Sequence, residues 1–299
     1  MKLHRENIQK PCASSGIGLE TARSLALHGA HIVMANRDFL ESKKIRDQIV
    51  KDKADAAIDI IIVNLDSLNS VKGAAEEPLH ALILNAGVFN PSAKKTLDGF
   101  ETAFGVNYLS HFYLIQLLLE KLRQSAPARI VVVSSISHNH TGVKSEWPLE
   151  EKMKTLIPGR QFSEAFCSIY KHYAVSKLDL NLMAVKLSRD EKINNIYVYI
   201  LHPGTMIGTG IARNFGFLWQ LIAMLTKPFT KSLQQGAATT IFCAVSDDLR
   251  NNSGHFFQDC QVANQNSAQL LMSDEELQDL LWNKTMDIIN EFERKLIKS

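Results

Sequence analysis

The sequence predicts a single α/β domain built on a doubly wound parallel sheet. From about Ser14 onward, short β-branched runs alternate with longer segments in which apolar residues recur every three or four positions. The short runs are continuously apolar, which is typical of strands buried on both faces. The number of strand and helix units in 299 residues favours one domain over two.

Six strands are expected, and each is a short run rich in aliphatic residues. They cover residues 31–36, 58–65, 79–84, 129–135 and 196–201 and a region near 254–257. Helices are expected at residues 18–28, 98–124, 165–189, 231–245 and 274–298, with Gly29 ending the first of them. No internal repeat or low-complexity linker interrupts this alternation.

The first strand of such a sheet is expected to be degenerate or missing. A doubly wound sheet of this kind begins with a buried strand directly before a glycine-bearing loop. Here the ten residues before Pro11 offer only Leu3 and Ile8 as aliphatic side chains. We therefore set residues 1–12 apart as an atypical N-terminal segment that precedes a domain of residues 13–299.

Composition and charge exclude several classes of protein. With 33 Lys and Arg against 31 Asp and Glu, acids and bases are interspersed, and we expect no nucleic-acid partner. Cys12, Cys167, Cys243 and Cys260 form no C-x-x-C pair and follow no secretion signal, so a disulfide framework or zinc site is not expected. The longest apolar stretch, residues 215–225, is too short to cross a bilayer. A cytoplasmic protein without a transmembrane segment is predicted.

A glycine-bearing motif occupies residues 13–18, at the start of the first predicted helix. It reads Ala-Ser-Ser-Gly-Ile-Gly, and the next strand ends about 20 residues after it. In such a loop glycines let the backbone approach a pyrophosphate, and the helix N-terminus favours an anion. An ordinary glycine-bearing turn is an equally good interpretation of this motif alone.

Tyr173 and Lys177 stand four residues apart and share one face of a predicted helix. An ammonium held near a phenol favours the phenolate, so we expect the pKa of Tyr173 to fall from about 10 toward the operating pH. Such a phenol can act as a general acid and base. Taken alone, the pair is better interpreted as a solvated contact on a helix surface.

Further polar and glycine residues follow the predicted strands. Ser135 ends one strand, Asn85-Ala86-Gly87 ends another, and His202-Pro203-Gly204 ends a third, while Asn107 lies in the long helix after Asn85. Parallel α/β sheets place their ligands at this carboxyl edge. The sequence therefore predicts that these residues gather around one ligand.

In kind and order, these motifs resemble those of the short-chain dehydrogenase/reductase family. The stretches TARSLALHGAHIVMANR, HFYLIQLLLEKLRQSAPARIVVVSSISH and KPFTKSLQQGAATTIFCA are similar to the branch that holds the WW-domain-containing oxidoreductases and retinol dehydrogenases. The resemblance runs from Ala13 to about Cys260. It implies a Rossmann-like fold, and no WW module is expected before it.

The resemblance also implies roles for the matched positions. Tyr173 would be the catalytic acid and base, Lys177 would bind the nicotinamide ribose and tune that tyrosine, and Ser135 would bind the substrate oxygen. Asn107 would hold the water of a proton relay. The implied cofactor-binding residues are Ser14, Ser15, Gly16, Ile17, Gly18, Asp66, Asn85, Ala86, Gly87, Lys177, Pro203 and Gly204, with Asp66 meeting the adenine.

The end of the predicted strand at residues 31–36 indicates NADP(H) as the cofactor. NAD-selective members place an acid there for the ribose 2′-hydroxyl, whereas Ala35-Asn36-Arg37 offers a cation suited to a 2′-phosphate. Arg37 as a solvated strand-end charge is the alternative.

Two places depart from the family's pattern. Pro11 and Cys12 stand where the family has Thr and Gly, and residues 70–78 replace a longer helix. Since Tyr173, Lys177 and Ser135 are all present, an alternative exon or a mis-set start explains the departures better than slow decay.

The sequence is compatible with three functions. The favoured one is an NADP(H)-dependent oxidoreductase acting on an apolar, steroid- or retinoid-like alcohol or carbonyl, with a homodimer left open. The second is an inactive member of the family that acts as a binding or interaction protein, and a sugar-nucleotide epimerase is the least favoured.

No metal is expected at His138-Asn139-His140, because no third ligand of suitable spacing follows. Residues 215–225 are predicted to be a substrate lid or a core helix.

Overall fold

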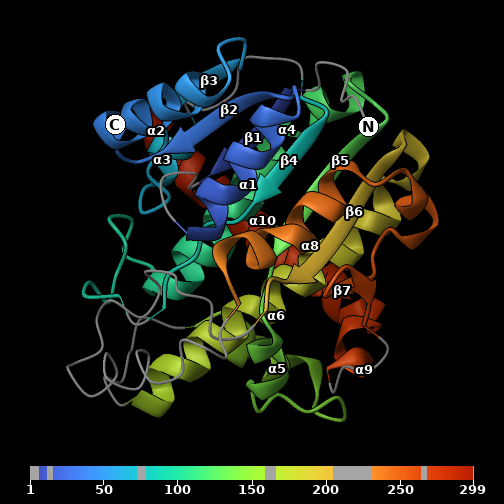
Figure 1. Cartoon of the computed structure of the whole chain (residues 1–299). Coiled ribbons are helices and arrows are strands. Elements are labelled where there is room, and N and C mark those ends of the chain that lie inside the picture. Colours follow the sequence, from blue (N-terminus) through green and yellow to red (C-terminus); the bar gives the residue numbers. More distant parts are fainter. Residues whose placement is uncertain are drawn as a thin grey trace.

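The computed structural model describes residues 7–11, 16–72, 79–89, 91–158, 166–204, 231–263 and 268–298. In this part of the chain one eight-stranded sheet has the order β3-β2-β1-β4-β5-β6-β7-β8 (Figure 1). Neighbouring strands are parallel except for the antiparallel pair β7 and β8. The strands are β1 (Asn7–Pro11), β2 (His31–Asn36), β3 (Ile58–Ile62), β4 (Ala81–Leu84), β5 (Ala128–Val133), β6 (Ile196–His202), β7 (Phe256–Gln258) and β8 (Gln261–Val262).

The expectation that the first strand is missing is wrong. Residues Asn7–Pro11 form β1, which pairs in parallel with β2 on one side and with β4 on the other. A β-ladder is made by backbone N–H and C=O groups, which every residue but proline supplies in full. Polar composition therefore did not prevent pairing, and Pro11, which lacks the N–H, is the last residue of the strand.

Helices cover both faces of the sheet and divide the core into two clusters. On one face lie α1 (Gly16–Leu27), α2 (Phe39–Asp52) and α8 (Leu233–Val245), with α1 and α8 in front of the sheet in Figure 1. On the other lie α3 (Leu68–Lys72), α4 (Ser110–Gln124), α6 (Phe166–Asp190) and α10 (Glu275–Lys298). Along β4, Ala81 and Ile83 join the first cluster while Leu82 and Leu84 join the second, as strand geometry requires.

Shorter elements complete the described chain. They are the π-helix η1 (Phe104–Leu109), the 3₁₀ helices η2 (Ile136–His140), η3 (Lys192–Asn194) and η6 (Asp247–Asn252), and the short helices α5 (Leu149–Leu156) and α9 (Gln269–Met272). No helix in the described ranges is both long and apolar enough to cross a membrane.

The helix α10 packs along α4 and α6. Phe112 of α4 meets Trp282 of α10 with ring centroids 4.7 Å apart, and the Tyr113 hydroxyl donates to Glu293 at 2.8 Å. On α6, Lys186 pairs with Asp279 at 2.8 Å. These contacts support the helix that carries the predicted catalytic residues.

Candidate active site

The helix α6 buries Tyr173 and Lys177 together, one turn apart. Their exposed fractions are 9% and 3%, and the Lys177 Nζ atom lies 5.7 Å from the centre of the Tyr173 ring. Lys177 Nζ donates a hydrogen bond to the carbonyl oxygen of Val133 at 3.0 Å. That bond leaves further N–H groups on the ammonium, so Lys177 is fixed in place and can still bind a ligand.

Burial governs the protonation of both groups. It raises the pKa of Tyr173 to about 12, although a hydrogen bond with Ser135 acts in the opposite direction. It lowers the pKa of Lys177 to about 8. The expectation that Lys177 lowers the pKa of Tyr173 is therefore wrong for the chain alone, because loss of water penalises phenolate and ammonium alike.

Ser135 stands where β5 ends and η2 begins. It caps η2, and its Oγ accepts a hydrogen bond from the Ser137 N–H at 3.2 Å. Its hydroxyl also lies 3.1 Å from the Ser137 Oγ and contacts the Tyr173 hydroxyl. The hydroxyls of Ser135 and Tyr173 therefore lie close enough to meet at one oxygen atom.

Asn107 lies in the π-helix η1, the wide turn that precedes α4. Its Oδ1 accepts from the Val88 N–H at 2.7 Å, and its Nδ2 donates to the Val88 carbonyl at 3.1 Å and to the Ser176 Oγ at 3.0 Å. A fully buried amide thus ties the segment after β4 to α6. Inserted π turns recur at functional sites because they re-aim one side chain.

The segment after β4 passes close to Lys177. A Cβ atom on Gly87 would lie 3.4 Å from the Lys177 Nζ and 3.6 Å from the Asn107 Oδ1. Asn85 is half-buried, Ala86 is buried and Gly87 is exposed. The backbone at Gly87 therefore leaves one side of the ammonium open, which fits a ligand lying across it.

The nucleotide end of the predicted site lies after β2 and β3. Arg37 is exposed, and burial raises the pKa of the half-buried Asp66, with Asp98 adding to the rise and Arg37 opposing it. Arg37 and Asp66 thus share one edge. The neighbouring acid, Asp38, accepts a hydrogen bond from the Glu41 N–H at 3.0 Å and caps α2.

The glycine motif opens α1. Gly16 has a φ of 59°, a left-handed conformation that favours glycine, and Ile17 and Gly18 are buried in the first turn. Cys12, Ser14 and Ser15 lie outside the described residues, as does the predicted lid at residues 215–225.

The end of β6 places a histidine, His202, at the carboxyl edge of the sheet. His202 is buried, and burial lowers its pKa to about 4. Neither ring nitrogen of His202 has a hydrogen-bond partner among the described residues. The half-buried Pro203 and Gly204 follow, and a Cβ on Gly204 would lie 2.6 Å from the Lys231 Cδ, so only glycine fits there without a shift of Lys231.

Sequence reasoning missed the aromatic neighbours of Tyr173. Phe89 lies against the Tyr173 ring, and Tyr170, three residues before Tyr173 on α6, lies against Phe89. The three-residue spacing could have identified Tyr170, since positions three apart share a helix face. Nothing in the sequence marked Phe89.

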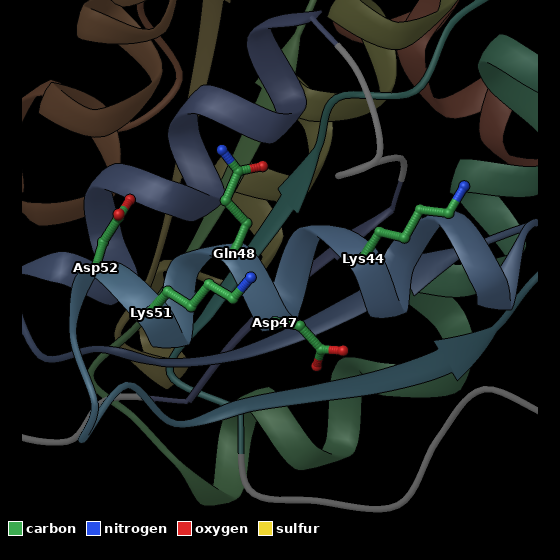
Figure 2. Close-up of a pocket in the computed structure, with 5 residues that line it drawn as sticks. All are labelled: Lys44, Asp47, Gln48, Lys51 and Asp52. Atoms are coloured by element: carbon green, nitrogen blue, oxygen red, sulfur yellow. The ribbon is translucent and has the colours of Figure 1, made fainter.

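A surface hollow elsewhere has no part in this site. It lies on the outer side of α2 and is lined by Lys44, Asp47, Gln48, Lys51 and Asp52 (Figure 2). These side chains are exposed, and Asp52 pairs with Arg23 at 2.9 Å. Within the described part of the chain, no group of three or more metal-ligating side chains could hold a metal ion.

Comparisons with known proteins agree with this geometry. The family model for short chain dehydrogenases matches residues 12–145. The chain is 40% identical over 255 residues to a WW domain-containing oxidoreductase of Gallus gallus, covering 83% of this chain and 60% of that protein. It is 36% identical over 270 residues to human retinol dehydrogenase 12, covering 86% of this chain and 81% of that protein.

A solved structure shows the same fold. A Beutenbergia cavernae protein crystallised with NADP superposes with a TM-score of 0.66 at 19% identity, covering 90% of this chain and 98% of that one. The relatives named for WW domains are longer, and this chain spans 60% of the Gallus gallus protein. The buried tyrosine and lysine, the strand order and these similarities lead to one conclusion: the chain belongs to the short-chain dehydrogenase/reductase family.

Proposed function

We propose that this protein is an NADP(H)-dependent oxidoreductase that interconverts an alcohol and a carbonyl on an apolar, steroid- or retinoid-like substrate. Residues 13–299 form its catalytic domain, and it works in the cytoplasm. One observation carries the proposal: the hydroxyls of Tyr173 and Ser135 meet beside the buried Lys177 at the carboxyl end of β5. The retinol dehydrogenases among its relatives support the substrate class.

The resting protonation state suits reduction of a carbonyl. Because burial raises the pKa of Tyr173 to about 12, the phenol is protonated at neutral pH and can donate its proton to the substrate oxygen. Ser135 polarises the same oxygen by a hydrogen bond. A bound nicotinamide supplies the hydride in this direction and accepts it in the reverse.

The residues present fit a dinucleotide phosphate. Gly87 leaves space beside Lys177 for the ribose, and Gly16 opens α1, whose N-terminus favours a pyrophosphate. At the far end Arg37 is exposed beside Asp66, while the carboxylate of Asp38 is engaged in capping α2. An exposed arginine at this strand end, with the Asp38 carboxylate engaged elsewhere, supports a 2′-phosphate and hence NADP(H).

Replacing Tyr173 with Phe tests the assignment. It deletes one hydroxyl that proton transfer needs, so turnover should fall by at least about 100-fold with little change in melting temperature. The measurement is nicotinamide absorbance with a panel of apolar carbonyls. Tyr197→Phe, a half-buried tyrosine of β6, is the control. A variant at position 173 that keeps most of its rate would sink the assignment.

A second candidate is an inactive member of the family that acts as a binding protein. Cys12, at the position of a family glycine, favours it, because a side chain there obstructs close approach of a cofactor. Titrating the protein with NADPH and NADH while following nicotinamide fluorescence separates the two functions. Saturable NADPH binding supports the enzyme, and no binding of either nucleotide supports the alternative.

A further inference from the structure

Three consecutive residues after β4 each contact a different member of the site. Gly87 approaches Lys177, Val88 is held by Asn107, and Phe89 lies against Tyr173. The Phe89 and Tyr173 ring centroids are 5.0 Å apart and the planes meet at 76°, an edge-to-face contact. The segment therefore runs from the lysine to the far side of the tyrosine.

A second aromatic residue continues this line. Tyr170 lies about one turn of α6 before Tyr173, on the side away from Lys177, and its ring meets Phe89 at 6.2 Å and 84°. The His140 Nδ1 lies 2.7 Å from the Tyr170 hydroxyl. Because Ser135 and His140 stand at the two ends of η2, that short helix follows the same direction as the tyrosines.

Burial decreases along this line. Tyr173 is buried, Phe89 and Tyr170 are half-buried, and His140 is exposed. The Lys177 end is where the proposed cofactor lies, so a substrate reaching the Tyr173 hydroxyl has its remainder on the opposite side. Two partly exposed rings held at fixed angles lie on that side.

We propose that Phe89 and Tyr170 form an aromatic wall that selects a flat, unsaturated alcohol or carbonyl, and that His140 positions Tyr170. The inference rests on the proposed function only in placing a substrate at Tyr173. Aromatic rings prefer flat partners through their quadrupoles, beyond what burial of apolar area provides. A puckered saturated ring of the same carbon skeleton gains burial but not this contact.

A matched pair of probes tests the wall. The flat probe is 2-naphthol, a phenol used for binding only, and the puckered probe is the alcohol decahydro-2-naphthol, and calorimetry gives the dissociation constant of each. The quantity measured is the ratio of the two constants in the wild type and in Phe89→Leu. We expect Phe89→Leu to reduce the preference for 2-naphthol about three- to tenfold.

The control is Phe292→Leu. Phe292 is also half-buried and also meets a tyrosine edge-to-face, Tyr113 at 6.3 Å and 77°, but on α10. It should leave the ratio unchanged. Tyr170→Phe keeps the ring and loses the hydroxyl that contacts His140, so its effect should be smaller than that of Tyr170→Leu. A probe ratio in Tyr170→Phe that equals the wild-type ratio would remove His140 as a positioning residue.

The outcomes separate this inference from the proposed function. If the wild type reduces 2-naphthaldehyde with NADPH and Tyr173→Phe does not, the oxidoreductase proposal is supported. This holds whether or not Phe89→Leu changes the ratio of dissociation constants. A binding ratio that is the same in the wild type and Phe89→Leu overturns the wall, as does failure of the wild type to bind either probe. A shifted ratio without turnover supports the wall and counts against the oxidoreductase.

Discussion

The two halves of the sheet contribute to the candidate site in different ways. One half is formed by β1, β2 and β3, and the other by β4, β5 and β6. The first half offers backbone and exposed charge: the ladder of β1, the left-handed Gly16 and the exposed Arg37. The second offers buried side chains, among them Asn107 and Lys177. The departure at Pro11 and Cys12 falls in the first half, at the end of β1.

The two halves also differ in how buried polar groups are paired. In the first, Thr21 donates to the Ile17 carbonyl at 2.8 Å, and Asn36 donates to Ser42 at 2.8 Å. In the second, neither carboxylate oxygen of Asp179 and neither ring nitrogen of His202 has a hydrogen-bond partner among the described residues. Within the described residues, the half that carries Tyr173 and Lys177 is therefore the less well paired of the two, and unpaired buried polar groups cost stability.

The largest effect is expected at β1. Its ladder neighbours Ile32, Met34 and Leu82 are buried, and each further buried aliphatic contributes about 1.5–3 kcal/mol. When residues 7–11 are replaced with an apolar strand and Cys12→Gly is added, both the melting temperature and the NADPH affinity should rise. Cys12→Gly alone should change the melting temperature and the NADPH affinity little. The unmodified chain should be marginally stable. Tight NADPH binding by the unmodified chain would show that the departure is tolerated.

Asp179→Asn should stabilise the protein. Burial raises the pKa of Asp179 well above its usual value, so the folded state binds a proton that the unfolded chain releases as pH rises above about 3.8. Stability from this group is present at low pH and is lost as pH rises. The variant should gain about 1–3 kcal/mol at pH 7 and less at pH 4, measured by urea unfolding. A loss of stability at pH 7 would contradict this.

Arg37→Asp should change the nucleotide preference. It removes the cation proposed to meet the 2′-phosphate and adds repulsion, so preference should move from NADPH toward NADH by about 1–3 kcal/mol. The ratio of the two dissociation constants is the measurement. Arg46→Asp makes the same charge change on α2 and is the control. An unchanged ratio would show that Arg37 is not the selector.

His111 should make stability fall in acid. Burial, aided by the nearby charge of Lys177, lowers its pKa to about 3. As pH falls below about 6.5, the unfolded chain takes up a proton that the folded state refuses until about pH 3, which costs about 1.4 kcal/mol per pH unit. His111→Asn should reduce this slope between pH 6 and 4, and His255→Asn, at an exposed position, is the control. An identical slope in His111→Asn would contradict this.

Apolar runs located most strands well because burial on both faces leaves a clear pattern. The expected strand at 31–36 coincides with β2, and 196–201 lies within β6. The helix α2 was missed because only Ser42, Ile45 and Ile49 of its residues are buried, and β1 was missed because its ladder needs no apolar side chain. Four positions of the candidate site, Asn107, Ser135, Tyr173 and Lys177, could be named from motifs, but the position of Phe89 depends on the path of a loop.

In the π-helix η1, the position of the Asn107 side chain depends on the number of residues in the helix as well as on their identity. Its wide turn holds one residue more than an α-helical turn would, and Asn107 reaches both backbone atoms of Val88 from it. Loss of a single codon within residues 104–109 would let the segment rewind as an α-helix, turning Asn107 by about 100° while α4 stays packed. The protein with this deletion would fold and keep every motif downstream. It would lose the hydrogen bonds by which Asn107 holds Val88, in the segment that leads to Tyr173.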